Sequence, residues 1–169
     1  MQDILDQIEA SVPALRRFAR ALTRNADRAD DLVQDCLERA LRKQGLFRPT
    51  GTIQAWLFAI LVNVWRNSAR SLRRRGDHVP FEALSVEPAI PAPQPGRIAL
   101  AELSRAIDAL PVDQREALLL VALEGFGYEE AASILKIPAG TLMSRLSRAR
   151  AALRILTGAG DEPRLRTVK

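Results

Sequence analysis

The chain has little of the raw material from which disulfides, metal sites and most catalytic centres are built. It contains one cysteine, Cys36, and one histidine, His78, in 169 residues. A single cysteine excludes an intramolecular disulfide and a thiolate zinc cluster, and a single histidine leaves almost nothing for a Ser-His-Asp triad or a His-rich metal site. We therefore predict that the protein is not an enzyme and that it uses no metal, cofactor or small-molecule substrate.

Long apolar runs are also missing from the sequence. None approaches the length that spans a membrane, and the first residues, MQDILDQIEA, are acidic and lack the apolar segment of a signal peptide. We expect a cytoplasmic protein with no membrane partner.

Aromatic residues are scarce, at 5%, although 47% of the chain is hydrophobic and 27% is charged. Leu, Ala and Arg dominate, which favours helices because strands draw on aromatic and β-branched residues. The predicted fold class is all-α. The net charge of +5 favours nucleic acid as a partner, but it also fits an acidic protein or a chain that is simply basic.

Prolines are concentrated in one stretch, since half of the ten lie in Pro80–Pro95. Proline removes backbone donors and disfavours helix in the residue before it, so this stretch is typical of an extended linker. The alternative is a long surface loop inside one domain. We predict two small helical domains joined by a Pro-rich linker. Their bounds are 1–75 for the first domain, 76–97 for the linker, 98–157 for the second domain and 158–169 for a tail.

Apolar residues spaced three or four apart predict the helices of both domains. In the first domain these are Asp3–Leu22, Asp27–Lys43 and Ile53–Arg75, with Pro13 expected to kink or split the first. In the second they are Leu100–Leu110, a helix that starts at Pro111 and ends before Gly125, Tyr128–Leu135 and Thr141–Leu156. A short helix, a tight turn that contains glycine and a longer amphipathic helix are typical of a helix-turn-helix.

Two of these helices have clear buried sides. In the second helix the predicted core residues are Ala29, Leu32, Val33, Cys36 and Ala40. In the third helix the predicted apolar stripe is Ile53, Trp56, Leu57, Ile60, Leu61 and Val64.

The last helix has an apolar side and a polar side, and no acidic residue occurs from position 131 to 160. With successive residues 100° apart, Leu142, Leu146, Ala149 and Leu153 fall on one side. Thr141, Ser144, Ser147, Arg148 and Ala151 fall on the other, flanked by Arg145 and Arg150. Such a surface is either solvated or aimed at a ligand. Its short side chains allow close approach to a DNA groove, so together with the preceding turn it favours DNA reading.

The second and third helices carry opposite charges. Asn63, Arg66, Arg70 and Arg73 recur on one side of the third helix, with Asn67 and Arg74 beside them, and this pattern favours phosphate and base contacts. Asp31, Gln34, Asp35 and Glu38 share the outer side of the second helix. Acidic residues repel DNA, so this side should meet water or a protein, and the residues alone leave that choice open.

The chain resembles the group IV, or extracytoplasmic function (ECF), RNA polymerase sigma factors of the sigma-70 family. DRADDLVQDCLERAL resembles regions 2.1–2.2, FRPTGTIQAWLFAILVNVWRNSARSLRRR resembles regions 2.3–2.4, and the stretch from LPVDQREALLL to SRLSRARAAL resembles region 4. PALRRFARAL, RADDLVQD and GFGYEEAA in particular resemble the alphaproteobacterial general-stress branch.

The resemblance implies an alternative sigma factor that binds core RNA polymerase and directs promoter-specific transcription initiation. It implies that the second helix binds the β′ clamp helices through Asp31, Gln34, Asp35 and Glu38, and that the second domain contacts the β flap. It implies contacts with the −10 element by Arg48, Asn63, Arg66, Asn67, Arg70, Arg73 and Arg74, the loop at Arg48–Thr52 capturing a flipped base. It implies contacts with the −35 element by Thr141, Met143, Ser144, Arg145, Ser147, Arg148 and Arg150.

Met143 departs from the family pattern, in which that position usually carries Lys or Arg. It removes one cation near the phosphates or a base donor, so the −35 preference of relatives does not carry over at that position. An anti-sigma factor is the further partner that the resemblance implies. Two alternatives remain at the level of sequence. One is a helix-turn-helix regulator that acts without core polymerase, and the other is a sigma-mimicking adapter that binds an anti-sigma factor.

Overall fold

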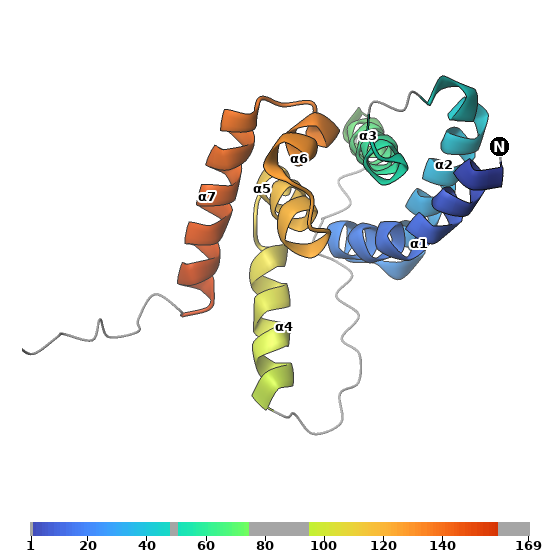
Figure 1. Cartoon of the computed structure of the whole chain (residues 1–169). Helices are drawn as coiled ribbons and strands as arrows, with labels where there is room; N and C mark the ends of the chain where they lie inside the picture. Colours follow the sequence, from blue (N-terminus) through green and yellow to red (C-terminus); the bar gives the residue numbers. More distant parts are fainter. Residues whose placement is uncertain (1, 48–50, 75–94, 159–169) are drawn as a thin grey trace, which may run out of the picture.

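The computed structural model describes residues 2–47, 51–74 and 95–158, and every regular element within these ranges is helical. The predicted all-α class is confirmed. The N-terminal half contains α1 (Gln2–Thr23), α2 (Ala26–Lys43), a 3-10 turn (Gln44–Leu46) and α3 (Ile53–Arg74). The C-terminal half contains α4 (Pro95–Asp108), α5 (Val112–Leu118), a π-helical stretch (Leu119–Leu123), α6 (Tyr128–Leu135) and α7 (Ala139–Leu156) (Figure 1). Residues 75–94, which make up most of the predicted linker, and 159–169 of the predicted tail lie outside the described residues.

The first helix is continuous through Pro13, which does not split it as the sequence suggested. Proline removes a single helical hydrogen bond at its own nitrogen. The side chain of Pro13 is exposed, whereas Leu15, Phe18 and Leu22 on the next turns are fully buried. Burial of the apolar side therefore holds α1 together across the proline.

The ends of α2 and α3 are fixed by side chains that precede them. Asn25 accepts a hydrogen bond from the backbone nitrogen of Arg28 at 2.9 Å and caps α2. Thr52 accepts one from the backbone nitrogen of Ala55 at 3.1 Å and caps α3 in the same way. Such caps satisfy orphan donors of the first helical turn. The core residues predicted for α2 are all buried, so that prediction is confirmed.

In the C-terminal half, the helical run that follows Pro111, made of α5 and the π-helical stretch, ends at Leu123 and so before Gly125, as predicted. The backbone of Gly125 has φ +77°, a conformation that costs glycine little. The fourth helix begins at Pro95, earlier than the predicted Leu100, since proline suits the first position of a helix. Lys136 ends α6 in a left-handed conformation, and α7 then begins at Ala139 rather than Thr141. These elements form the predicted helix-turn-helix.

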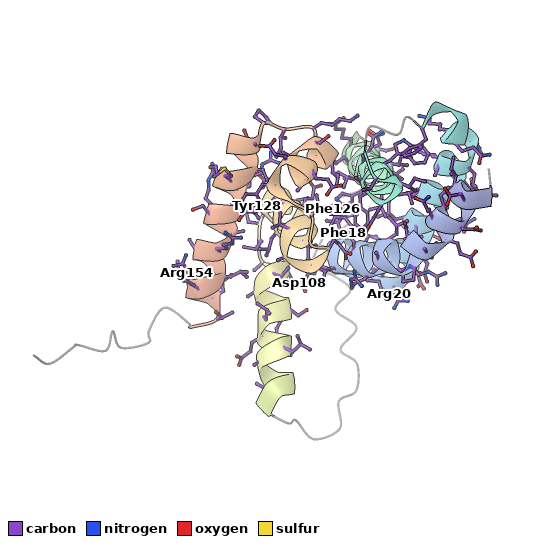
Figure 2. All side chains as sticks on the ribbon, in the orientation of Figure 1. Phe18, Arg20, Asp108, Phe126, Tyr128 and Arg154 are labelled. Carbon is purple, nitrogen blue, oxygen red and sulfur yellow. The ribbon has the colours of Figure 1, made fainter. Side chains whose placement is uncertain are left out.

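The two halves share one hydrophobic core. In Figure 1, α3 lies between the α1–α2 pair and α6, and its buried residues form one cluster with those of α5 and α6. The ring of Phe58 on α3 contacts Phe18 of α1 at 5.2 Å and Phe126, just before α6, at 5.0 Å, both edge to face. Figure 2 labels Phe18 and Phe126 near the middle of the molecule. The row of aromatic rings therefore connects the halves.

A buried arginine stabilises the joint between the halves. Arg115 of α5 is 3% exposed and donates to the backbone carbonyls of Asp108 at 2.9 Å, Leu110 at 3.0 Å and, in the other half, Leu22 at 3.5 Å. Burial lowers the pKa of Arg115, since desolvation disfavours the charged form. Close by, Arg24 Nε lies 3.2 Å from Asp108 Oδ2. The end of α1 is thus tied to the turn between α4 and α5.

Candidate nucleic-acid interface

Helix α7 has the two sides that its sequence predicts. Leu142, Leu146 and Ala149 are at most 2% exposed and pack on the helices before it. On the opposite side Thr141, Ser147 and Arg148 are exposed and Ser144 is half-buried. Arg148 Nη2 donates to Ser144 Oγ at 2.7 Å, which holds the guanidinium along the helix. We call Thr141, Ser144, Ser147, Arg148 and Ala151 the reading face.

The residues that flank the reading face differ in solvent exposure. Arg150 is exposed, and Met143 is 55% exposed at the margin of the face. Arg145 is turned toward α5, where its Nε lies 3.4 Å from Asp113 Oδ2 and its side chain is 20% exposed. In this arrangement Arg145 supports the packing of α7 on α5, and its charge is already shared with a carboxylate.

On α3, the predicted basic side is partly open and partly occupied. Asn63, Asn67 and Arg70 are exposed, with Asn67 Nδ2 3.4 Å from Asn63 Oδ1. Arg73 and Arg74 belong to the last turn of α3, whereas Arg48 lies outside the described residues.

Arg66 is held by the C-terminal half. Its Nη2 and Nε donate to Glu116 Oε2 and Oε1 at 2.6 and 3.3 Å, and its Nη1 donates to the carbonyl of Leu135 at 3.0 Å. The Glu116 side chain is 2% exposed, and that of Arg66 is 30% exposed. Sequence reasoning placed Arg66 correctly on the basic side of α3 but missed Glu116. Only a contact across 50 positions reveals it.

Beside Arg66 is a small cavity of about 150 Å³ between α3 and the end of α6. Asn63, Arg70 and Lys136 contribute its polar lining, together with Arg66. The helix-turn-helix thus brings a further cation, Lys136, to the basic side of α3.

A larger groove, of about 530 Å³, lies where the start of α3 meets α6. Phe47 and Trp56 line it, with their ring centroids 5.4 Å apart, and Glu129 and Glu130 line it from α6. Thr52 Oγ1 donates to Glu130 Oε1 at 3.1 Å across the groove. This is the region in which the resemblance puts the captured base, and the C-terminal half borders it with acidic residues.

The predicted acidic stripe, Asp31, Gln34, Asp35 and Glu38, is exposed along α2. Gln34 Nε2 donates to Glu38 Oε1 at 3.3 Å, and Arg42 Nη2 lies 3.5 Å from Glu38 Oε2. The four residues share the exposed side of α2, as predicted, and both of these contacts stay within α2.

Neither a metal cluster nor a membrane-spanning helix is found in the described part of the chain. No group of three or more His, Cys, Asp or Glu residues there could hold a metal ion. None of the described helices is long and apolar enough to cross a membrane.

Comparison with known proteins agrees with this geometry. A family model described as the Sigma2 domain of PhyR matches residues 8–62, and one described as Sigma-70, region 4 matches residues 100–153. The chain is 46% identical over 154 residues to the ECF RNA polymerase sigma factor EcfG of Rhodopseudomonas palustris, covering 89% of this chain and 83% of that protein.

Solved structures with the same fold include a sigma factor. RpoE of Bartonella quintana, crystallised with the anti-sigma factor NepR, is 38% identical with a TM-score of 0.78, covering 96% of this chain and 100% of that one. CnrH, solved with the cytosolic domain of CnrY, is 26% identical with a TM-score of 0.68, covering 95% and 90%.

A helical protein with an open helix-turn-helix and a separate acidic stripe fits the class of transcription initiation factors. The chain belongs to the ECF RNA polymerase sigma factor family. The predicted family is confirmed, and the matches to EcfG and to the Bartonella RpoE agree with the general-stress branch that the motifs favoured.

Proposed function

We propose that the protein brings core RNA polymerase to promoters by reading the −35 element with α7. The observation that carries this proposal is the reading face itself, polar and open above a buried row of leucines. Ser144, Ser147 and Arg148 contact base edges in the major groove, while Thr141 and Arg150 contact phosphates. Arg145 also contacts a phosphate once its ion pair with Asp113 is broken.

Met143 gives the reading face an apolar group where the family pattern has a cation. An exposed thioether contacts a thymine methyl group or a sugar rather than a phosphate. At Met143 the −35 preference of this chain therefore depends less on a contact with the charged DNA phosphates.

The −10 element is the proposed ligand of α3. Asn63, Asn67 and Arg70 are exposed and supply amide and guanidinium donors, with Arg73 and Arg74 on the upstream backbone. Arg48 and the groove at Phe47 and Trp56 receive the base that is pulled from the stack, where an aromatic ring provides a stacking surface. Arg66 contributes when it is free of Glu116.

Protein partners complete the proposal. The acidic stripe on α2 binds the β′ clamp helices of core polymerase, and the C-terminal half contacts the β flap. An anti-sigma factor restrains the protein, a role supported by the relative RpoE, which was solved with the anti-sigma factor NepR. As an initiation factor it works in the cytoplasm and catalyses no reaction of its own.

Run-off transcription with core polymerase and a genomic template library tests the function. We expect promoter-specific transcripts with the full chain, and a loss of roughly 5- to 150-fold with Arg148→Ala, since a good base contact contributes about 1–3 kcal/mol. Arg154→Ala is the matched control, because Arg154 is also exposed but lies in the last turn of α7. A wild-type chain that gives no promoter-specific transcript would overturn the proposal.

A sigma-mimicking adapter is the second candidate, and the match to the Sigma2 domain of PhyR favours it. An adapter needs an anti-sigma surface but no reading face. If the wild-type chain gives no transcript with core polymerase but binds an anti-sigma factor, and Arg148→Ala and Arg70→Ala leave that binding unchanged, the adapter is the better account. A regulator that acts without polymerase would instead bind a palindromic duplex tightly on its own.

A further inference from the structure

Met143 of α7 presents an accessible sulfur at the margin of the reading face. The residue is 55% exposed, whereas its apolar neighbours Leu142 and Leu146 are at most 2% exposed. Gly140, one turn earlier on the helix, leaves room beside it, since a Cβ added at Gly140 would meet no atom within 4 Å. Small solutes therefore have access to the thioether of Met143.

Helical geometry places Met143 beside residues that the proposed function assigns to DNA. Ser147 follows it by one turn and Arg150 by two turns, so the three residues share one line along α7. Ser147 and Arg150 are both exposed. A change of polarity at Met143 therefore takes place next to a hydroxyl and a guanidinium that are aimed at the −35 element.

The thiol of the chain does not compete with Met143 for an oxidant. Cys36 is fully buried, with its Sγ 3.4 Å from the carbonyl oxygen of Leu57. Burial raises its pKa to about 12, which keeps the sulfur in the unreactive protonated form. The sequence has one other methionine, Met1, which lies outside the described residues. Among the described residues, Met143 is thus the sulfur that a peroxide can reach.

From this arrangement we infer that Met143 is an oxidation site, and that its modification by a peroxide weakens the reading of the −35 element. The sulfur lone pair attacks one oxygen of hydrogen peroxide, and the S–O bond forms as the O–O bond breaks. The proton on the transferred oxygen moves to the departing hydroxide, which leaves as water. The thioether loses two electrons to the peroxide and becomes a sulfoxide, which a reductase that draws two electrons from a dithiol converts back.

The sulfoxide changes what this part of α7 offers to DNA. The thioether packs on a thymine methyl group or a sugar, whereas the polar sulfoxide oxygen retains water and loses that apolar contact. The oxygen accepts hydrogen bonds and donates none, so it cannot bond to a phosphate oxygen. It is also within one turn of the Ser147 hydroxyl, which can donate to it instead of to a base edge. The oxidation concerns this chain alone, while its effect on promoters rests on the proposed function.

Peroxide treatment of the full-length chain, before any polymerase is added, tests the oxidation site. The chain is exposed to hydrogen peroxide, freed of it with catalase and mapped by mass spectrometry of its peptides. We expect one added oxygen on Met143, no oxidation of Cys36 and unchanged helical circular dichroism. If Met143 stays unmodified while a methionine-containing peptide in the same solution is oxidised, the site is overturned.

Run-off transcription with untreated core polymerase tests the effect on promoter reading. The template carries a promoter that the untreated chain transcribes, and the chain is kept at a limiting concentration. The oxidised chain should give about fourfold less transcript, the factor expected for losing the burial of one methylene-sized group. Methionine sulfoxide reductases with a dithiol should restore the signal. Met143→Gln, a polar side chain of similar length, should show the same loss without peroxide.

The matched control is Met143→Leu, which keeps an apolar group, removes the sulfur and leaves Met1 in place. It should transcribe as well as untreated wild type and should not respond to peroxide. Equal transcription by oxidised and untreated wild type, or the same peroxide-dependent loss in Met143→Leu, would overturn the inference. Failure of the proposed function is a different result, because untreated wild type would then give no promoter-specific transcript while Met143 would still gain an oxygen by mass.

Discussion

Cys36 is packed in the core, and this burial suppresses the reactivity of its thiol. It is fully buried on α2, and its Sγ lies 3.4 Å from the carbonyl oxygen of Leu57. Burial raises the pKa of its thiol from an ordinary value of about 9 to about 12, and the positive charge of Arg39 offsets only part of that shift. The thiol is thus a small core residue and not a reactive one.

The raised pKa of Cys36 predicts a pH dependence of stability. Below pH 9 the thiol is protonated in both states and contributes none. Between pH 9 and 12 the unfolded chain releases the proton and the folded chain keeps it, so the free energy of unfolding falls. The slope from this group is about 1.4 kcal/mol per pH unit. Urea unfolding at pH 8, 9 and 10 measures it, and Cys36→Ala is expected to lack that part of the decrease. Equal slopes for the two proteins would contradict the prediction.

Helix α2 presents its acidic stripe to solvent, with its opposite side buried. Asp35→Arg reverses a charge in the middle of the stripe without touching the core, so stability should change by less than about 0.5 kcal/mol. If the stripe binds core polymerase, we expect roughly tenfold weaker binding, measured by fluorescence anisotropy. Glu9→Arg, on the exposed side of α1, makes the same charge change elsewhere. Equal losses in both variants would indicate a general charge effect and not a docking site.

Helix α3 shows which buried residues can be predicted from the sequence and which cannot. The predicted stripe was largely right, since Ile53, Leu57, Leu61 and Val64 are buried. The prediction did not include Phe58, whose partner Phe126 is 68 positions away in sequence. Periodicity identifies one apolar side of a helix facing its neighbours. A second side that packs on a distant half is visible only once the halves are placed together.

Charged residues at the interface were harder still to predict. The pattern placed Arg66 on a basic surface, and Arg115 and Glu116 had no assigned role. Both are among the most buried residues of α5, at 3% and 1% exposure. Arg and Glu are seldom buried unless paired, so their residue types alone predict that the side chains are exposed to solvent. Arg115 donates to a carbonyl of α1 as well as to two carbonyls of its own half, and Glu116 pairs with a guanidinium of α3.

At the scale of the whole molecule, the surfaces for different partners are kept apart. In Figure 1, α2 with the acidic stripe and α7 with the reading face lie at opposite sides of the structure, with α3 and α6 between them. Opposite placement lets an acidic docking surface coexist with a basic DNA surface, since screening at physiological salt is strong beyond about 8 Å. The helices in between carry contacts that join the two halves.

The shared core predicts that the free chain unfolds as one unit. Both of its tryptophans, Trp56 and Trp65, lie on α3, so tryptophan fluorescence reports the N-terminal half, whereas far-UV circular dichroism reports all helices. The two probes should give the same midpoint in urea, as a single cooperative transition requires.

A truncation in the C-terminal half sharpens that test. Phe126→Ala removes a ring that is 7% exposed and contacts Phe58, a change that costs about 3–5 kcal/mol in a well-packed core. Because the ring is shared, the loss should lower the midpoint of the tryptophan signal as well as that of the dichroism. Tyr128→Ala, at a residue that is 43% exposed on α6, should leave both nearly unchanged. If Phe126→Ala lowers only part of the dichroism and leaves the fluorescence midpoint where it was, the halves fold independently and the shared core does not couple them.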